Sequence, residues 1–217
     1  MKFVSIIMIA TLVSCKQSAI TKQEQEARVL PFYTAADFTP HWIERNSSMY
    51  ASIHTIPSFQ FTGQDNQSIT EKTFAGKIYV ADFFFTACPG ICKRLTTNLA
   101  LVQTAFKNDN EVLLLSHSVT PESDDVPRLQ QYANAYGVIK SKWHLVTGKR
   151  EEIYGIARNA YFADEDMGVK KNSSDFLHTE NVLLIDKHRR IRGVYKGTSV
   201  KDINDLIADI KILKLEE

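Results

Sequence analysis

The chain has 217 residues, of which 44% are hydrophobic and 10% aromatic. This length and content suffice for the core of one globular domain and leave little for a second. With 26 basic and 25 acidic residues, the chain lacks the excess positive charge of a nucleic-acid-binding protein, so no nucleic acid partner is expected.

The N-terminus has the pattern of a secretory lipoprotein signal. Lys2 precedes an apolar stretch over residues 3–13, which is too short for the roughly 20 residues that span a bilayer but suits a signal sequence. Residues 12–15, Leu-Val-Ser-Cys, resemble the bacterial lipobox. We expect residues 1–14 to be removed and Cys15 to carry lipid, anchoring the protein to a membrane on the extracytoplasmic side of the bacterial cell envelope. An ordinary signal-peptide cysteine is the alternative.

A polar segment separates this signal from the folded part. Residues 18–28 are rich in Lys, Gln and Glu and show no apolar periodicity, which indicates a flexible tether. Aromatic residues become frequent from Phe32 onward. The expected organisation is therefore a signal peptide over residues 1–14, a lipidated tether over 15–29 and one domain over 30–217.

The first half of the domain predicts a hairpin, a buried strand and a helix. Alternating polar and apolar residues at 58–62 and 68–70 flank a turn. Residues 78–85 are almost continuously apolar, as in a central strand buried on both faces. Leu95, Leu99, Val102 and Phe106 then follow at helical spacing.

The second half continues the alternation of strands and helices. The expected elements are strands over 112–116 and 143–147, helices over 126–136, 151–159 and 200–213, and a hairpin over 180–195. This order predicts an α/β domain with a central mixed sheet flanked by helices.

Two cysteines lie between the strand 78–85 and the following helix. Residues 88–92 read Cys-Pro-Gly-Ile-Cys, and Cys15 is the third cysteine of the chain. The position resembles the thioredoxin arrangement, in which a helix N-terminus favours the thiolate. Three intervening residues, instead of the usual two, place the sulfurs about one helical turn apart, so that they could chelate one soft metal ion or close into a disulfide. A purely structural disulfide is disfavoured because the loop is very short.

A third metal ligand is sought among the six histidines. His178 is the best candidate because it precedes the strand at 182–185, a position that in thioredoxin-like folds packs against the cysteine helix. Two thiolates and an imidazole suit both Cu(I) and Cu(II). From the residues alone, a loop histidine bound to the backbone remains the alternative.

Other candidate groups are weaker. His117 could approach the site but is interpreted as a core or surface residue. Met49 and Met167 could be soft copper donors but are interpreted as core packing residues. Asp82 is unusual within an apolar strand; it could tune Cys88 or transfer protons, or it could pair with a hydroxyl or a basic group.

Several motifs together resemble the Sco/SenC family of thioredoxin-like copper-binding proteins, over about residues 56–213. They are residues 76–77, 84–92, 118–124, 143–148, 177–179, 184–187 and 193–195. The resemblance implies a thioredoxin-like fold with an added N-terminal hairpin and a hairpin insertion, and one copper held by Cys88, Cys92 and His178. It also implies copper delivery to, or thiol reduction at, the dinuclear copper centre of cytochrome c oxidase, with the copper-bearing subunit and a thiol reductant as partners.

The chain departs from the family pattern at three positions. Lys93 replaces a common proline, Leu177 a common aspartate and Thr120 an expected aspartate. None of these changes removes a ligand. The leading hypothesis is a copper-transfer protein rather than an enzyme. The alternative is a thiol-disulfide reductase in which Cys88 attacks and Cys92 resolves; a peroxiredoxin-type peroxidase is a third, weaker hypothesis.

Overall fold

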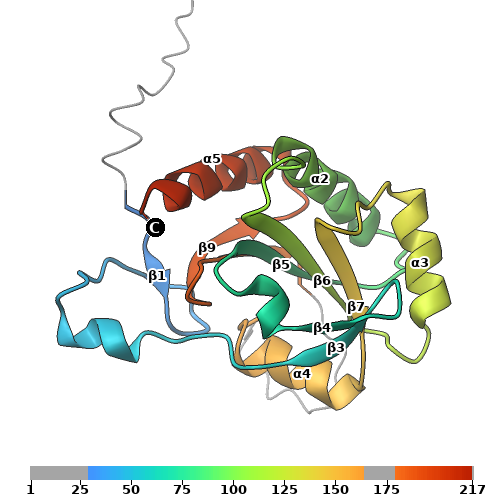
Figure 1. Cartoon of the computed structure of the whole chain (residues 1–217), viewed down its shortest axis with the longest axis horizontal. Coiled ribbons are helices and arrows are strands. Elements are labelled where there is room, and N and C mark those ends of the chain that lie inside the picture. Colours follow the sequence, from blue (N-terminus) through green and yellow to red (C-terminus); the bar gives the residue numbers. More distant parts are fainter. Residues whose placement is uncertain (1–28, 164–178, 217) are drawn as a thin grey trace, which may run out of the picture.

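A nine-stranded mixed sheet forms the centre of the protein in the computed structural model, which describes residues 29–163 and 179–216 (Figure 1). The strand order is β2-β1-β9-β8-β5-β6-β7-β3-β4. The strands are β1 Phe32–Tyr33, β2 Pro40–His41, β3 Gln60–Gly63, β4 Ser68–Thr70, β5 Ile78–Phe84, β6 Val112–Ser118, β7 Trp143–Thr147, β8 Asn181–Ile185 and β9 Ile191–Lys196.

Helices cover both faces of the sheet. They are the short η1 Ser48–Ser52 and η2 Glu71–Phe74, and the α-helices α2 Ile91–Ala105, α3 Val126–Ala135, α4 Arg150–Asn159 and α5 Val200–Glu216. Figure 1 shows α2 and α5 on one side of the sheet and α4 on the other. Strands β5, β6 and β7 run parallel, whereas β8 is antiparallel to β5 and β3 is antiparallel to β7.

Strand β5 divides the core because its side chains alternate between the two faces. Val80 and Phe84 pack with α2, α3 and α5 in one apolar cluster. Ala81 and Phe83 pack with α4 and the β3–β4 hairpin in the other. All seven residues of β5 are buried, as the continuous apolar run predicts.

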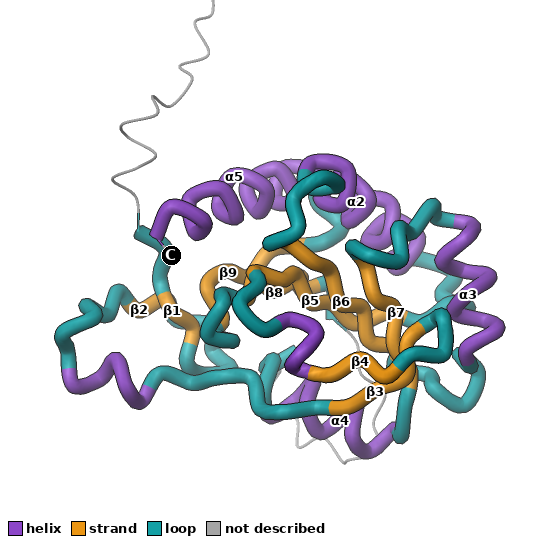
Figure 2. Tube along the Cα trace, in the orientation of Figure 1, coloured by secondary structure: helices purple, strands orange, loops and turns teal. Residues whose placement is uncertain are grey.

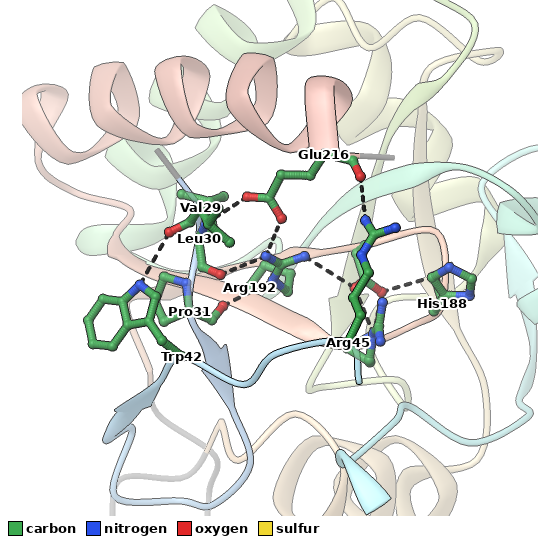
Figure 3. Close-up of polar contacts among 10 residues, drawn as sticks. Val29, Leu30, Pro31, Trp42, Arg45, His188, Arg192 and Glu216 are labelled. Atoms are coloured by element: carbon green, nitrogen blue, oxygen red, sulfur yellow. Dashed lines mark hydrogen bonds and ion pairs between the residues drawn. The ribbon is translucent and has the colours of Figure 1, made fainter. Parts of the chain in front are cut away.

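The N-terminal arm, residues 29–31, is bonded to the end of α5 and to β9 (Figure 3). The buried guanidinium of Arg192 donates to the backbone oxygens of Leu30 at 2.6 Å and Pro31 at 3.0 Å, and it pairs with Glu216 at 2.5 Å. The amide of Leu30 donates to the same Glu216 carboxylate at 2.6 Å. Figure 2 shows β1 and β2 accordingly at one end of the sheet, beside the end of α5. Segments far apart in the sequence thus close the sheet at this edge.

The predicted elements agree with the structure. Both hairpins are confirmed, as β3–β4 and β8–β9. Strand β6 extends two residues beyond the predicted end, to Ser118, and α5 reaches Glu216. The packing role predicted for Met49 is wrong, because its side chain is 59% exposed on η1. Met167 lies outside the described residues. Within the described residues, no helix is both long and apolar enough to cross a membrane.

Candidate metal centre

The two cysteines lie where β5 passes into α2, as predicted. Strand β5 ends at Phe84, residues 85–90 form the connection, and α2 begins at Ile91. Cys88 and Cys92 are both free thiols, 7% and 5% exposed. The amide of Cys92 points at the Cys88 sulfur from 3.5 Å, which is the contact expected when four positions span one helical turn.

Cys88 is arranged to carry negative charge. Burial on its own raises the pKa of this thiol, but hydrogen bonds from the amides of Cys92, Gly90 and Ile91 and from the Cys92 thiol outweigh burial, so the pKa of Cys88 falls below its usual value. These amides are the unsatisfied donors of the first turn of α2, where the helix dipole also favours an anion. Cys88 is therefore the more reactive of the two thiols.

Cys92 is arranged to keep its proton. Burial raises the pKa of the Cys92 thiol, the neighbouring Cys88 raises it further, and the carboxyl of Asp82 acts in the same direction. A hydrogen bond from the Phe85 amide opposes these effects without cancelling them. The pair thus combines one thiol whose pKa is lowered, Cys88, with one whose pKa is raised, Cys92, and the Cys92 thiol donates a hydrogen bond to Cys88.

Asp82 lies in the same core layer as the cysteines. Its carboxyl accepts a short hydrogen bond from the Ser116 hydroxyl, which in turn accepts from the Trp143 indole at 2.8 Å. Its other oxygen, Oδ2, has no hydrogen-bond partner among the described residues. Burial raises the pKa of Asp82 to about 7. Of the alternatives considered for this residue, pairing with a hydroxyl group is confirmed.

An apolar pocket of about 290 Å³ opens at the cysteine pair. Both cysteines line it, together with Phe85 from the connection, Ile91 from α2 and Val119 from the end of β6. Such a lining offers the sulfurs few competing polar groups. Two soft sulfur donors in an apolar pocket suit Cu(I).

His178 lies outside the described residues, so its place as a third ligand stays a prediction. The next residue, Thr179, is 9% exposed and lines the pocket. The chain therefore returns to the cysteine pair one residue after His178. In the described part of the chain, no three side chains among His, Cys, Asp and Glu are grouped so that they could hold a metal ion.

His117 does not face this pocket. It is fully buried on the opposite side of the sheet, with its ring stacked on Phe83 at a centroid distance of 4.9 Å and edge-on to Phe61 at 5.5 Å. Burial lowers the pKa of His117 to about 4, so the ring is neutral at physiological pH. Of the two positions predicted for His117, core and surface, the core position is confirmed.

Asp124 ends the motif over residues 118–124, but the sequence did not predict its role near the site. Its carboxylate is fully buried and accepts four hydrogen bonds, from the amide and hydroxyl of Thr86 and from the hydroxyls of Ser118 and Thr120. The sequence does contain a signal for this role: the hydroxyl residues Thr86, Ser118 and Thr120 are potential donors to an acidic residue that precedes α3.

The fold and the paired thiols define a thioredoxin-like protein with a cysteine pair at a helix N-terminus. The family model SCO1/SenC matches residues 48–214, and the chain belongs to this family.

Three solved structures are similar to this chain. A SCO1/SenC family lipoprotein from Bacillus anthracis is 30% identical, with a TM-score of 0.64 over 74% of this chain and 95% of the other. BsSco, in which a disulfide switch has been identified, belongs to the Sco family of cytochrome c oxidase assembly proteins; it is 27% identical, with a TM-score of 0.64 over 76% and 95%. Copper-bound ScoI from Arabidopsis thaliana is 25% identical, with a TM-score of 0.56 over 73% and 97%.

Proposed function

We propose that this protein is a copper chaperone, which binds one copper ion through Cys88, Cys92 and His178 and passes it to the copper-bearing subunit of cytochrome c oxidase. The observation that carries the proposal is that two free thiols, one of which has a lowered pKa, line the same apolar pocket. Copper bound to ScoI from Arabidopsis thaliana and the role of BsSco's family in oxidase assembly support it.

The residues suggest an order of binding. Cys88 ionises more readily than Cys92 and would bind first, because the pKa of Cys88 is lowered and that of Cys92 is raised, so that Cys92 must release its proton before its sulfur can bind. An imidazole from His178 would complete a set of two soft donors and one nitrogen, suited to both oxidation states of copper. Transfer would proceed by ligand exchange, with groups of the acceptor replacing these three one at a time.

The same proposal includes the anchor. Cys15 would carry lipid after removal of residues 1–14, residues 15–29 would form the tether, and the domain from residue 30 would face the extracytoplasmic side. A similar protein from Bacillus anthracis is a lipoprotein, which supports this arrangement. A thiol reductant would keep the cysteines reduced in that compartment.

Copper titration of the reduced protein tests the ligand set. We expect one copper ion per chain in either titration, with Cu(I) or with Cu(II), and we expect His178→Ala to weaken Cu(II) binding at least about tenfold, because the nitrogen donor is lost. His188→Ala, which changes an exposed histidine in the β8–β9 turn, is the matched control and should bind as the wild type does. Intact Cu(II) binding by the His178 variant would overturn the proposed ligand set.

A thiol-disulfide reductase is the second candidate function. The different surroundings of the two thiols favour it, since an activated Cys88 and a protonated Cys92 are also what a nucleophile and a resolving cysteine require. His178 would then be dispensable. Oxidase assembly that survives His178→Ala but is abolished by Cys92→Ser would favour the reductase over the chaperone.

A further inference from the structure

We propose that Asp124 is a positioning residue for the cysteine pair, and that it acts through Thr86. This inference rests on the proposed function of the pair, because it assigns a role in shaping the same site. Asp124 lies between β6 and α3 and is not itself in the pocket. It reaches the site through the connection that carries Cys88.

The contact is made to one peptide unit, the one that joins Phe85 to Thr86. Its N–H donates to Asp124 Oδ2 at 3.1 Å, and its carbonyl oxygen accepts from the Cys88 amide at 3.3 Å. A trans peptide is planar, with its N–H and C=O on opposite sides. When Asp124 fixes the direction of the N–H, it therefore also fixes the carbonyl that holds Cys88.

The next peptide unit toward the N-terminus serves the other cysteine. The Phe85 amide donates a hydrogen bond to the Cys92 sulfur. Successive amides thus point to two different acceptors, Cys92 for residue 85 and Asp124 for residue 86. A rotation of the peptide unit between Phe85 and Thr86 would turn the Phe85 carbonyl away from the Cys88 amide, and a shift of Phe85 with it would also disturb the contact between the Phe85 amide and Cys92.

The Thr86 side chain adds a second hydrogen bond to the Asp124 carboxylate. Its hydroxyl donates to Asp124 Oδ1 at 2.6 Å and accepts from Arg128 Nε, on α3, at 3.0 Å. Thr86 is thereby held through its backbone and its side chain at once. A single hydrogen bond would still allow the peptide to rotate, whereas two bonds to one carboxylate do not.

Asp124 is itself held from the other side. The Ser118 hydroxyl at the end of β6 donates to its carboxylate at 2.6 Å, and the Thr120 hydroxyl donates at 3.0 Å. The backbone amide of Asp124 donates to the Thr120 carbonyl at 2.9 Å. A buried carboxylate is costly unless such bonds compensate it. The Asp124 carboxylate is held by Ser118 at the end of β6, and it also accepts two hydrogen bonds from Thr86 in the connection that carries Cys88.

The test compares two substitutions at Thr86 with one at Ser118. Thr86→Val removes the hydroxyl but keeps the shape of the side chain and the amide. Thr86→Ser keeps the hydroxyl and is the rescue variant. Ser118→Ala removes an equally short bond to the same carboxylate, but from the β6 side, and controls for a loss of stability alone.

Two properties of the site are measured beside thermal stability: Cu(I) affinity, and the equilibrium constant of the Cys88–Cys92 dithiol with glutathione in the absence of copper. We expect Thr86→Val to weaken Cu(I) binding about tenfold or more, as outer contacts of metal ligands typically do. We expect it to shift the copper-free equilibrium toward the disulfide, because the reduced pair loses its oriented amides. Thr86→Ser and Ser118→Ala should stay within about twofold of the wild type in both.

Wild-type values for Thr86→Val in both measurements would overturn the inference, as would equal shifts for Ser118→Ala. If Thr86→Val does not fold, Asp124→Asn takes its place, since it exchanges one acceptor for a donor at nearly constant shape and should shift both properties in the same directions. A wild-type protein that binds no copper would overturn the proposed function instead, and the glutathione equilibrium would still test the role of Asp124.

Discussion

The two cysteines differ in their surroundings although they lie one helical turn apart. Cys88 receives hydrogen bonds from three amides of the helix N-terminus, whereas Cys92 is packed among apolar side chains with Asp82 nearby. The position of a residue relative to the helix end therefore decides which thiol ionises more readily. A motif of two cysteines does not reveal this difference by itself.

Asp82 should make the stability of the reduced, copper-free protein fall as pH rises. Burial raises its pKa to about 7 in the folded state, from 3.8 in the unfolded chain. Between these values the unfolded chain releases the proton and the folded protein keeps it, so the contribution of Asp82 to stability is full below about pH 4 and is lost above about pH 7.

The variant Asp82→Asn cannot ionise and should lack this loss. Relative to the wild type, its free energy of unfolding should rise by about 2–3 kcal/mol between pH 5 and pH 8. Urea denaturation at the two pH values measures the change. A constant difference between variant and wild type would show that Asp82 keeps an ordinary pKa in the folded protein.

At the scale of elements, the sequence predicted the strands and helices well because their apolar patterns are local. The apolar run over 78–85 and the apolar residues spaced from Leu95 to Phe106 indicate which faces are buried. Because the cysteine pair lies between these two segments, its position at a strand-to-helix junction could be predicted. The hold of Asp124 on Thr86 joins residues 38 positions apart through side-chain direction, which no local pattern encodes. The contact between α2 and the residue after β9, where Asn98 donates to the Gly197 carbonyl at 2.9 Å, could not be predicted for the same reason.

Two glycines show how closely elements pack at different places. A Cβ added at Gly197, just after β9, would lie 2.6 Å from a Val182 methyl on β8 and 3.0 Å from Leu95 on α2. A Cβ at Gly155, inside α4, would meet nothing within 4 Å. We expect Gly197→Ala to destabilise the protein by about 1–3 kcal/mol through overpacking.

Gly155→Ala is the matched control and should stabilise by about 0.5–1 kcal/mol, because alanine loses less backbone entropy in a helix. Thermal or urea unfolding of both variants measures the two changes. The same sign for both would contradict this account of the packing between β9 and α2.

At the scale of the whole molecule, the first residues of the domain and the last helix depend on each other. Arg192 on β9 contacts the N-terminal arm, Asp186 at 3.6 Å and Glu216 near the end of α5. Residue 29, where the proposed tether ends, therefore lies beside the C-terminal end of the domain (Figure 3). The sequence predicted a folded start near residue 30 from aromatic content, but it did not predict what holds that start in place.

Replacement of Arg192 by methionine should destabilise the domain strongly without changing the copper site. The substitution leaves Glu216 and the carbonyls of residues 30 and 31 without the buried cation that bonds them, whereas Asp186 keeps its ion pair with Arg190 at 2.8 Å. Removing one partner of a buried ion pair typically costs about 3–5 kcal/mol. Urea unfolding measures this loss.

Lys201→Met is the control. It breaks an exposed ion pair with Asp205 on α5 and should change stability little, because water screens such pairs. At a temperature where both variants are folded, Cu(I) affinity should equal that of the wild type, since none of these groups lines the cysteine pocket. A loss of copper affinity in the folded Arg192 variant would mean that the arm and the metal centre are coupled across the sheet.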